Sequence, residues 1–223
     1  MIRVRACLFD AYGTLFDVHS AVSSLASRVG PKSSEVSALW RQRQIEYSWF
    51  RTMLGRHADF ASVTADALDY ALAVHGVVDP TLREDLLSAY RRLSAYPEVP
   101  SMLDQLRAAG LRTGVLSNGA PEMLGAAIAA AGLDQRFDAV LSVESVGAFK
   151  IDRRVYQYAV DAMGLPAREI AFQSSNAWDA AAAADFGFVV HWINRAGLPR
   201  EYEWAGPVTE LKDLSALPRA IGL

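Results

Sequence analysis

Short apolar runs, separated by longer segments with helical periodicity, give the first outline of the fold. The runs that read as buried strands are residues 4–9, 112–116, 139–142, 170–173 and 188–193. The segments between them that read as helices are residues 100–109, 121–131, 153–163 and 178–186. Strands that alternate with helices in this way predict an α/β core, in which a parallel sheet is covered by helices on both faces.

The alternation is interrupted once, between the first apolar run and Pro97. That stretch carries helix patterns and no convincing strand. A pair of serines begins an amphipathic pattern over residues 33–50, which indicates a capped helix, and two more helices are expected at residues 60–75 and 80–94. The predicted domains are therefore an α/β core of residues 1–17 and 97–223, and an all-helical cap of residues 18–96 inserted after strand one.

The composition narrows the class of protein and of partner. Of the 223 residues, 52% are hydrophobic and 21% are charged, as expected for a globular enzyme with a sizeable core. A net charge of −3 offers no basic surface for nucleic acid or anionic membrane. The chain shows no signal-peptide pattern and no apolar run near the ~20 residues that span a bilayer, so a cytoplasmic location is expected. The single cysteine, Cys7, lies in an apolar run, which excludes an intrachain disulfide and predicts core packing.

Polar side chains collect where the predicted strands end. Each has an ordinary structural explanation when taken singly, as a turn residue, a solvated charge or a helix-start acid. Ligands of an open parallel sheet, however, bind beyond the carboxyl ends of its strands, and four segments deliver polar groups to that edge. The groups are Asp10, Tyr12 and Thr14, then Ser117, Asn118 and Gly119, then Lys150, and finally Ser174, Ser175, Asn176 and Asp179. We therefore predict the functional site at this edge.

These segments also resemble the four motifs of the haloacid dehalogenase superfamily, in the expected order. The first is FDAYGTL at residues 9–15, and LSNG at residues 116–119, Lys150 and SSNAWD at residues 174–179 follow. The resemblance extends from about residue 6 to residue 194. It implies a Rossmann-like core with a cap after the first strand, and it makes Asp10 the nucleophile.

Phosphatases of that superfamily carry a second aspartate two residues after the nucleophile, which protonates the leaving alkoxide. Here that position is Tyr12. A halide leaves as a stable anion and needs no proton, so the loss of this acid disables phosphoryl transfer but not dehalogenation.

The fourth motif departs from the phosphatase pattern as well. Mg²⁺ prefers carboxylate oxygens, and Asp179 is the only acid in SSNAWD. Asp10 and Asp179 balance the charges of Lys150 and a candidate Arg41 without a divalent cation. We therefore expect neither a metal ion nor another cofactor.

Within the superfamily, DAYGTLFD and SSNAWD resemble the (S)-2-haloacid dehalogenases, which also use an arginine on a cap helix. Residues 39–44, LWRQRQ, resemble that helix segment and make Arg41 the candidate, with Ile45 on the same helix face. The family commonly has proline after the lysine of the third motif, whereas this chain has Ile151. Proline would restrict Lys150 towards an extended conformation, but it carries no chemistry.

The resemblance implies a role for each site residue. For the reacting groups, Lys150 keeps Asp10 ionised, Ser117 and Lys150 hold the substrate carboxylate, and Arg41, Asn118 and Trp178 cradle the halide. Around them, Thr14, Ser174 and Tyr156 position Asp10 and Lys150, Asn176 and Asp179 orient or activate water, and Tyr12, Ile45, Phe60 and Trp178 form an apolar wall. Whether Asp179 or Lys150 is the base stays open at this point.

The predicted activity is the hydrolysis of short 2-haloalkanoic acids to 2-hydroxy acids, with inversion at C2, through an ester on Asp10. The predicted partners are the 2-haloacid and the halide, and homodimers are common among the relatives it resembles. One alternative is a Mg²⁺-dependent phosphatase, or a phosphonatase, whose cap supplies a Schiff-base lysine; Lys32 is the only lysine in this cap. Another is a non-catalytic relative that binds a small acid or a protein partner, but such a chain tends to lose the nucleophile or its counter-ion.

Overall fold

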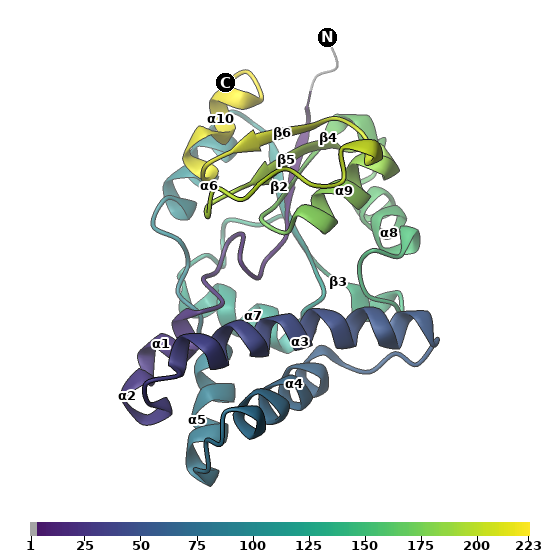
Figure 1. The fold of residues 1–223 in the computed structure, drawn as a ribbon. Helices are drawn as coiled ribbons and strands as arrows, with labels where there is room; N and C mark the ends of the chain where they lie inside the picture. Colours follow the sequence, from purple (N-terminus) through teal and green to yellow (C-terminus); the bar gives the residue numbers. More distant parts are fainter. Residues whose placement is uncertain (1–3) are drawn as a thin grey trace.

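The computed structural model describes residues 4–223, so residues 1–3 of the predicted core segment 1–17 lie outside the described residues. Within the described chain, six parallel strands form one sheet in the order β3-β2-β1-β4-β5-β6 (Figure 1). The strands are β1 (Ala6–Phe9), β2 (Arg112–Ser117), β3 (Ala139–Ser142), β4 (Ile170–Ser174), β5 (Val189–Ile193) and β6 (Val208–Leu211). Five of them were predicted; β6 was not.

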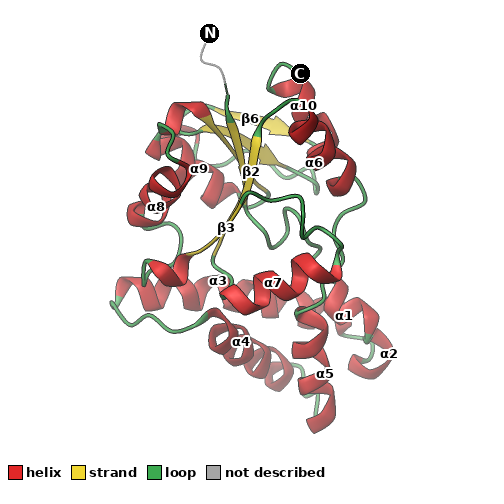
Figure 2. Cartoon of the chain, turned by 180° about the vertical axis from the view of Figure 1, so that it is seen from behind, coloured by secondary structure: helices red, strands yellow, loops and turns green. Residues whose placement is uncertain are grey.

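Helices cover both faces of this sheet, which confirms the predicted α/β class. In Figure 2, α6 (Val99–Ala108) and α10 (Leu217–Ala220) lie on one face, and α8 (Arg153–Met163) and α9 (Ala177–Phe186) lie on the other. A further helix, α7 (Pro121–Ala130), packs against β3. Cys7 is fully buried in β1, as expected, and burial raises the pKa of its thiol to about 12.

The register of the sheet explains why the motifs meet. Phe9, the last residue of β1, pairs with Val115 of β2 and with Gln173 of β4. All three strands run parallel, so their carboxyl ends lie at one level. The strand order reverses beside β1, which is the position where open α/β sheets form a ligand crevice. Asp10 therefore begins the loop at the mouth of that crevice.

The segment between β1 and α6 is helical, as expected, and it packs as a separate layer below the sheet in Figure 1. Its helices are α1 (Ser20–Ser24), α2 (Ala26–Val29), α3 (Ser33–Met53), α4 (Phe60–Val74) and α5 (Pro80–Tyr90). The chain leaves and re-enters the core at one place, because the backbone N–H of Asp17 donates to Ser94 O (2.9 Å) and that of Tyr96 donates to Leu15 O (3.0 Å). This pairing lies next to the predicted cap boundaries, residues 18 and 96, which stay a prediction.

The predicted serine cap of the longest helix is wrong. The residue that precedes α3 is Lys32, and its side chain makes no capping bond. Aspartates cap the next two helices instead: Asp59 accepts from Ser62 N, and Asp79 accepts from two backbone N–H groups at the start of α5. Ser33 is the first residue of α3, so the helix begins one residue earlier than the amphipathic pattern indicates.

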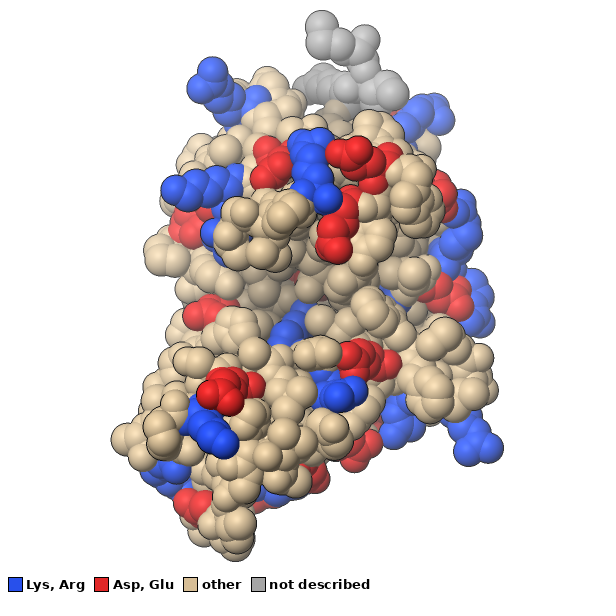
Figure 3. Space-filling view, in the orientation of Figure 1, with Lys and Arg blue, Asp and Glu red and all other residues tan. Residues whose placement is uncertain are grey.

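Two hydrogen bonds fasten the helical layer onto the core near the carboxyl ends of the strands. The backbone N–H of Phe60 donates to Glu144 Oε1 (3.1 Å), and that of Phe149 donates to Thr52 Oγ1 (3.0 Å). On the face shown in Figure 3, positive and negative side chains are interspersed over both layers. Across residues 4–223 there is no helix of the length and apolarity that a bilayer crossing demands.

Candidate active site

A buried chain of charges lies at the carboxyl end of the sheet. Lys150 Nζ donates to Asp10 Oδ1 (3.1 Å) and to Asp179 Oδ2 (2.8 Å), and the Tyr156 hydroxyl donates to Asp179 Oδ1 (2.8 Å). Lys150 and Asp179 are 1% and 0% exposed, so the lysine is a desolvated cation shared by two carboxylates. These four residues come from the loops after β1 and β3 and from α8 and α9.

The surroundings of Lys150 and Asp179 set their protonation states. Burial by itself lowers the pKa of Lys150, but Asp10 and Asp179 outweigh it and raise that pKa above 10.5. Burial raises the pKa of Asp179, and the nearby Asp10 adds to this, while Lys150 and the Tyr156 hydroxyl oppose it. At neutral pH Lys150 is therefore an ammonium ion, and Asp179 is a more basic carboxylate than an exposed aspartate.

The second oxygen of Asp10 is held by neutral donors. Thr14 Oγ1 donates to Asp10 Oδ2 (3.2 Å), and Asn176 Nδ2 donates to the same oxygen (2.9 Å). Thr14 is itself fixed by Ser175, whose backbone N–H donates to its hydroxyl (2.8 Å). Ser174 lies one step away, where its hydroxyl accepts from the backbone N–H of Asn176 (3.2 Å). Sequence reasoning assigned positioning to Ser174 and gave Ser175 no role.

The loop after β2 lies on the other side of Asp10. The Ser117 hydroxyl is fully buried and accepts from Gly119 N (3.1 Å), so its own proton is available to a ligand. Asn118 Oδ1 accepts from the backbone N–H of Lys150 (2.9 Å), which links the second and third motifs. Ile151 follows in the position where the family commonly has proline. The Lys150–Ile151 peptide is cis, and the lysine head group reaches Asp10.

Helix α3 brings Arg41 to the site from the helical layer. One guanidinium nitrogen donates to Gln44 Oε1 (2.8 Å), and the other donates to Tyr12 O (3.1 Å) and Asn176 Oδ1 (3.3 Å). Ile45 and Ser48 lie on the same helix face and line the same cavity. Gln44 and Ser48 were not predicted, although their spacing of three and seven residues places them on the same helix face as Arg41.

The cavity bounded by these groups is small. Its lining consists of Asp10, Tyr12, Arg41, Ile45, Ser48, Phe60, Ser117, Asn118, Asn176 and Trp178. It leaves about 10 Å³ for the centre of a water-sized sphere, which is room for roughly one water or one halide ion.

Aromatic rings form one side of the cavity. The Tyr12 ring lies 5.6 Å from the Phe60 ring and 5.4 Å from the Tyr90 ring, measured between centroids. Burial, with a contribution from Tyr90, raises the pKa of Tyr12 well above 10, so this phenol stays neutral. Its buried hydroxyl has no hydrogen-bond partner within residues 4–223.

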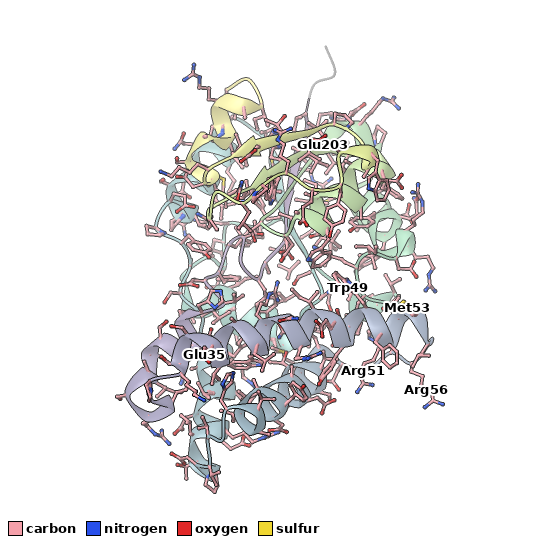
Figure 4. The ribbon with its side chains drawn as sticks, in the orientation of Figure 1. Glu35, Trp49, Arg51, Met53, Arg56 and Glu203 are labelled. Atoms are coloured by element: carbon pink, nitrogen blue, oxygen red, sulfur yellow. The ribbon has the colours of Figure 1, made fainter. Side chains whose placement is uncertain are left out.

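Trp178 separates this cavity from a larger cleft between α3 and the core. The cleft measures about 420 Å³ by the same criterion, and Trp49, Met53, Ile151 and Tyr202 contribute to its walls. In Figure 4, Trp49 lies on the side of α3 that faces the core. Its ring packs edge-on against that of Trp178, with 5.2 Å between the ring centroids. Trp178 therefore lines both the cavity and the cleft.

The donor set does not match a divalent metal site. Among residues 4–223 no cluster of three or more histidine, cysteine, aspartate or glutamate side chains is arranged to hold a metal ion. The position between Asp10 and Asp179 is taken by the ammonium group of Lys150. Lys150 thus supplies one positive charge to these two carboxylates from within the protein.

Comparison with known proteins agrees with the fold and the geometry. The family model described as haloacid dehalogenase-like hydrolase matches residues 4–187. The chain is 48% identical over 222 residues to (S)-2-haloacid dehalogenase 1 of Pseudomonas sp. (strain CBS-3), which covers 99% of this chain and 98% of that protein. It belongs to the haloacid dehalogenase-like hydrolases and, within them, to the (S)-2-haloacid dehalogenases.

Two solved structures are similar over nearly their whole length. One is a dehalogenase with an intermediate complex, with a TM-score of 0.96 and 46% identity, covering 99% of this chain and 98% of that one. The other is L-2-haloacid dehalogenase from Xanthobacter autotrophicus with chloropropionic acid covalently bound, with a TM-score of 0.89 and 36% identity, covering 98% of both chains.

Proposed function

We propose that this chain hydrolyses short 2-haloalkanoic acids of the S configuration to 2-hydroxy acids of the R configuration, without a metal ion. The observation that carries the proposal is the Asp10–Lys150–Asp179 arrangement, in which two carboxylates share one buried ammonium ion. Support for the substrate class comes from relatives named (S)-2-haloacid dehalogenase at 48% and 47% identity.

In the first step an oxygen of Asp10 attacks C2 from the side opposite the halogen. The carbon–halogen bond breaks, the halide leaves with its electron pair, and C2 is inverted as an ester forms. Ser117 and Lys150 bind the substrate carboxylate, and Asn118, Trp178 and Arg41 surround the leaving halide. This step needs no general acid at position 12, where the chain has Tyr12, because halide leaves as a stable anion.

In the second step water attacks the acyl carbon of Asp10, which releases the 2-hydroxy acid and leaves C2 untouched. One oxygen of the regenerated carboxylate comes from water. We assign the base to Asp179, because Lys150 is protonated and has no lone pair to accept a proton, whereas burial raises the pKa of Asp179. Asn176 orients this water, and Ser174 accepts from its backbone N–H. Thr14 holds Asp10, and Tyr156 holds Asp179, which in turn contacts Lys150.

The alternative functions receive less support. A phosphonatase needs a lysine from the cap, and Lys32 is exposed at the start of α3 and does not line the cavity. A phosphatase needs an acid at position 12, which is tyrosine. A non-catalytic binding protein has no need to preserve a buried lysine in contact with the nucleophile.

The test measures halide release from each enantiomer of 2-chloropropionate, with and without excess chelator. We expect activity on the S enantiomer only, with an R product and no effect of the chelator. A single turnover in heavy-oxygen water should place the label in Asp10; label that appears first in the product would mean that water attacks C2 directly. Metal-dependent activity would contradict the charge argument.

Two further proposals concern the setting of the enzyme. We propose a cytoplasmic location, which fractionation of cells that express the protein would test. We also propose a homodimer, supported by Phe50, Met53 and Leu54, which are 59%, 76% and 56% exposed at the end of α3. Sedimentation of the purified protein tests the second proposal, and a monomer at all concentrations contradicts it.

A further inference from the structure

Gln44 is a buried polar residue on α3 that the proposed reaction does not use. It is 1% exposed, yet its amide makes three hydrogen bonds. Its oxygen accepts from Arg41 (2.8 Å) and from the Tyr90 hydroxyl (3.1 Å), and its nitrogen donates to Thr64 Oγ1 (2.7 Å). The Thr64 hydroxyl in turn donates to Phe60 O (2.7 Å), so all the polar groups of this cluster are paired.

This cluster fixes both the position and the amide orientation of Gln44. Thr64 uses its proton on Phe60 O, so it can only accept from Gln44, and this places the nitrogen of the amide towards α4. The oxygen must then face Arg41 and Tyr90. Residues of α3, α4 and the end of α5 therefore converge on Gln44. Their contacts direct its amide oxygen towards Arg41.

The partners of Arg41 share one property: all of them are neutral. They are the amide of Gln44, the backbone carbonyl of Tyr12 and the amide of Asn176, and no ion pair to Arg41 forms within the described part of the chain. Other arginines of α3 behave differently, since Arg43 pairs with Glu46 and Arg51 pairs with Asp66.

We infer that Gln44 is a positioning residue that holds Arg41 in the cavity while leaving its charge unneutralised for the departing halide. The inference rests on the proposed halide-binding role of Arg41. A carboxylate at position 44 would hold the guanidinium equally well but would form an ion pair with it. A neutral acceptor of the same length orients the cation and preserves its attraction for an anion.

The test compares Gln44→Glu with Gln42→Glu, which adds the same charge to the exposed side of the same helix. Bromide affinity is measured at constant ionic strength in two ways: as product inhibition of dehalogenation, and as the saturable change in tryptophan fluorescence of the resting protein. We expect Gln44→Glu to weaken bromide binding by about tenfold or more, and Gln42→Glu to change it less than about twofold.

A second variant covers the case in which Gln44→Glu does not fold. Thr64→Val keeps the volume of the side chain but removes the acceptor that orients the Gln44 amide, and we expect a several-fold loss of bromide affinity from it. Unchanged bromide affinity in Gln44→Glu, an equal loss in both glutamate variants, or unchanged affinity in Thr64→Val where only that variant folds, would overturn the inference.

The two assays keep this inference separate from the proposed function. If no 2-haloacid is hydrolysed, the proposed function fails, and the fluorescence titration still decides the role of Gln44. If the unmodified protein hydrolyses 2-haloacids but shows no saturable bromide binding, the function stands and the inference is overturned.

Discussion

The site contains two cations that are held in opposite ways. Lys150, from the core, is almost fully buried and contacts two carboxylates; Arg41, from the helical layer, is partly exposed and contacts only neutral oxygens. The charge of Lys150 is satisfied inside the protein, whereas that of Arg41 is not. The comparison indicates a structural and electrostatic task for the lysine and a ligand-binding task for the arginine.

The largest expected effect comes from Lys150→Met. Removing the ammonium ion leaves Asp10 and Asp179 buried without a counter-ion, which should lower the free energy of unfolding by about 3–5 kcal/mol. Dehalogenation should fall by about a thousandfold or more, because the nucleophile and the substrate carboxylate both lose their cation. Denaturant unfolding and halide release measure the two effects, and unchanged stability would mean that the pair is not the buried unit described here.

Arg41→Met should separate the two cations. We expect a loss of activity of about 10- to 100-fold, since a charged hydrogen-bond donor to the halide is worth roughly 1.5–3 kcal/mol. Stability should change by less than about 1 kcal/mol, because no buried charge is left unpaired. Arg43→Met, at a half-buried arginine of α3 that does not line the cavity, is the control for helix packing. An equally large stability loss in Arg41→Met and Lys150→Met would remove the contrast.

Tyr156→Phe removes the hydrogen bond from the Tyr156 hydroxyl to Asp179, one of the two carboxylates that contact Lys150. The Tyr156 hydroxyl helps to lower the pKa of Asp179, so its removal should raise that pKa further. We expect about a tenfold fall in kcat/KM and a shift of the acidic limb of the pH profile to higher pH. A fall in rate with an unmoved pH profile would assign Tyr156 to packing alone.

The smallest effect is an alkaline loss of stability that belongs to Lys150 alone. Its pKa in the folded protein lies above 10.5, so its contribution is present in full below that value and is lost as pH rises through the folded pKa. Unfolding at a series of alkaline pH values should show this loss in the unmodified protein and in Arg41→Met, but not in Lys150→Met. The same decline in Lys150→Met would assign it to other groups.

The sequence predicts the core side of this comparison better than the helical side. Asp10, Lys150 and Asp179 follow strands whose apolar runs are easy to recognise, and parallel register then brings their ends together. Gln44 and Ser48 escaped prediction because a glutamine or serine on an amphipathic helix reads as surface until the packing of α3 on α4 is known.

The apolar and helical patterns of the sequence missed a half-exposed strand and misplaced the start of one helix. Strand β6 lies at the sheet edge, and its burial is low, so Val208–Leu211 lacks the apolar run that identified the others. The serine cap at Ser33 failed by one residue, which is the usual uncertainty of helix ends. Neither error touches the site, because both lie away from the carboxyl ends of the central strands.

The paired crossing at Leu15–Tyr96 and Asp17–Ser94 has a consequence for how the molecule tolerates change. Since the two ends of the intervening segment already touch, that segment closes on itself without needing the core to fix its span. Its length and contents are free to vary through evolution or engineering while the register of β1 and β2 is kept. The core keeps the nucleophile and its lysine, and the inserted helices add Arg41 to the same site from outside the sheet.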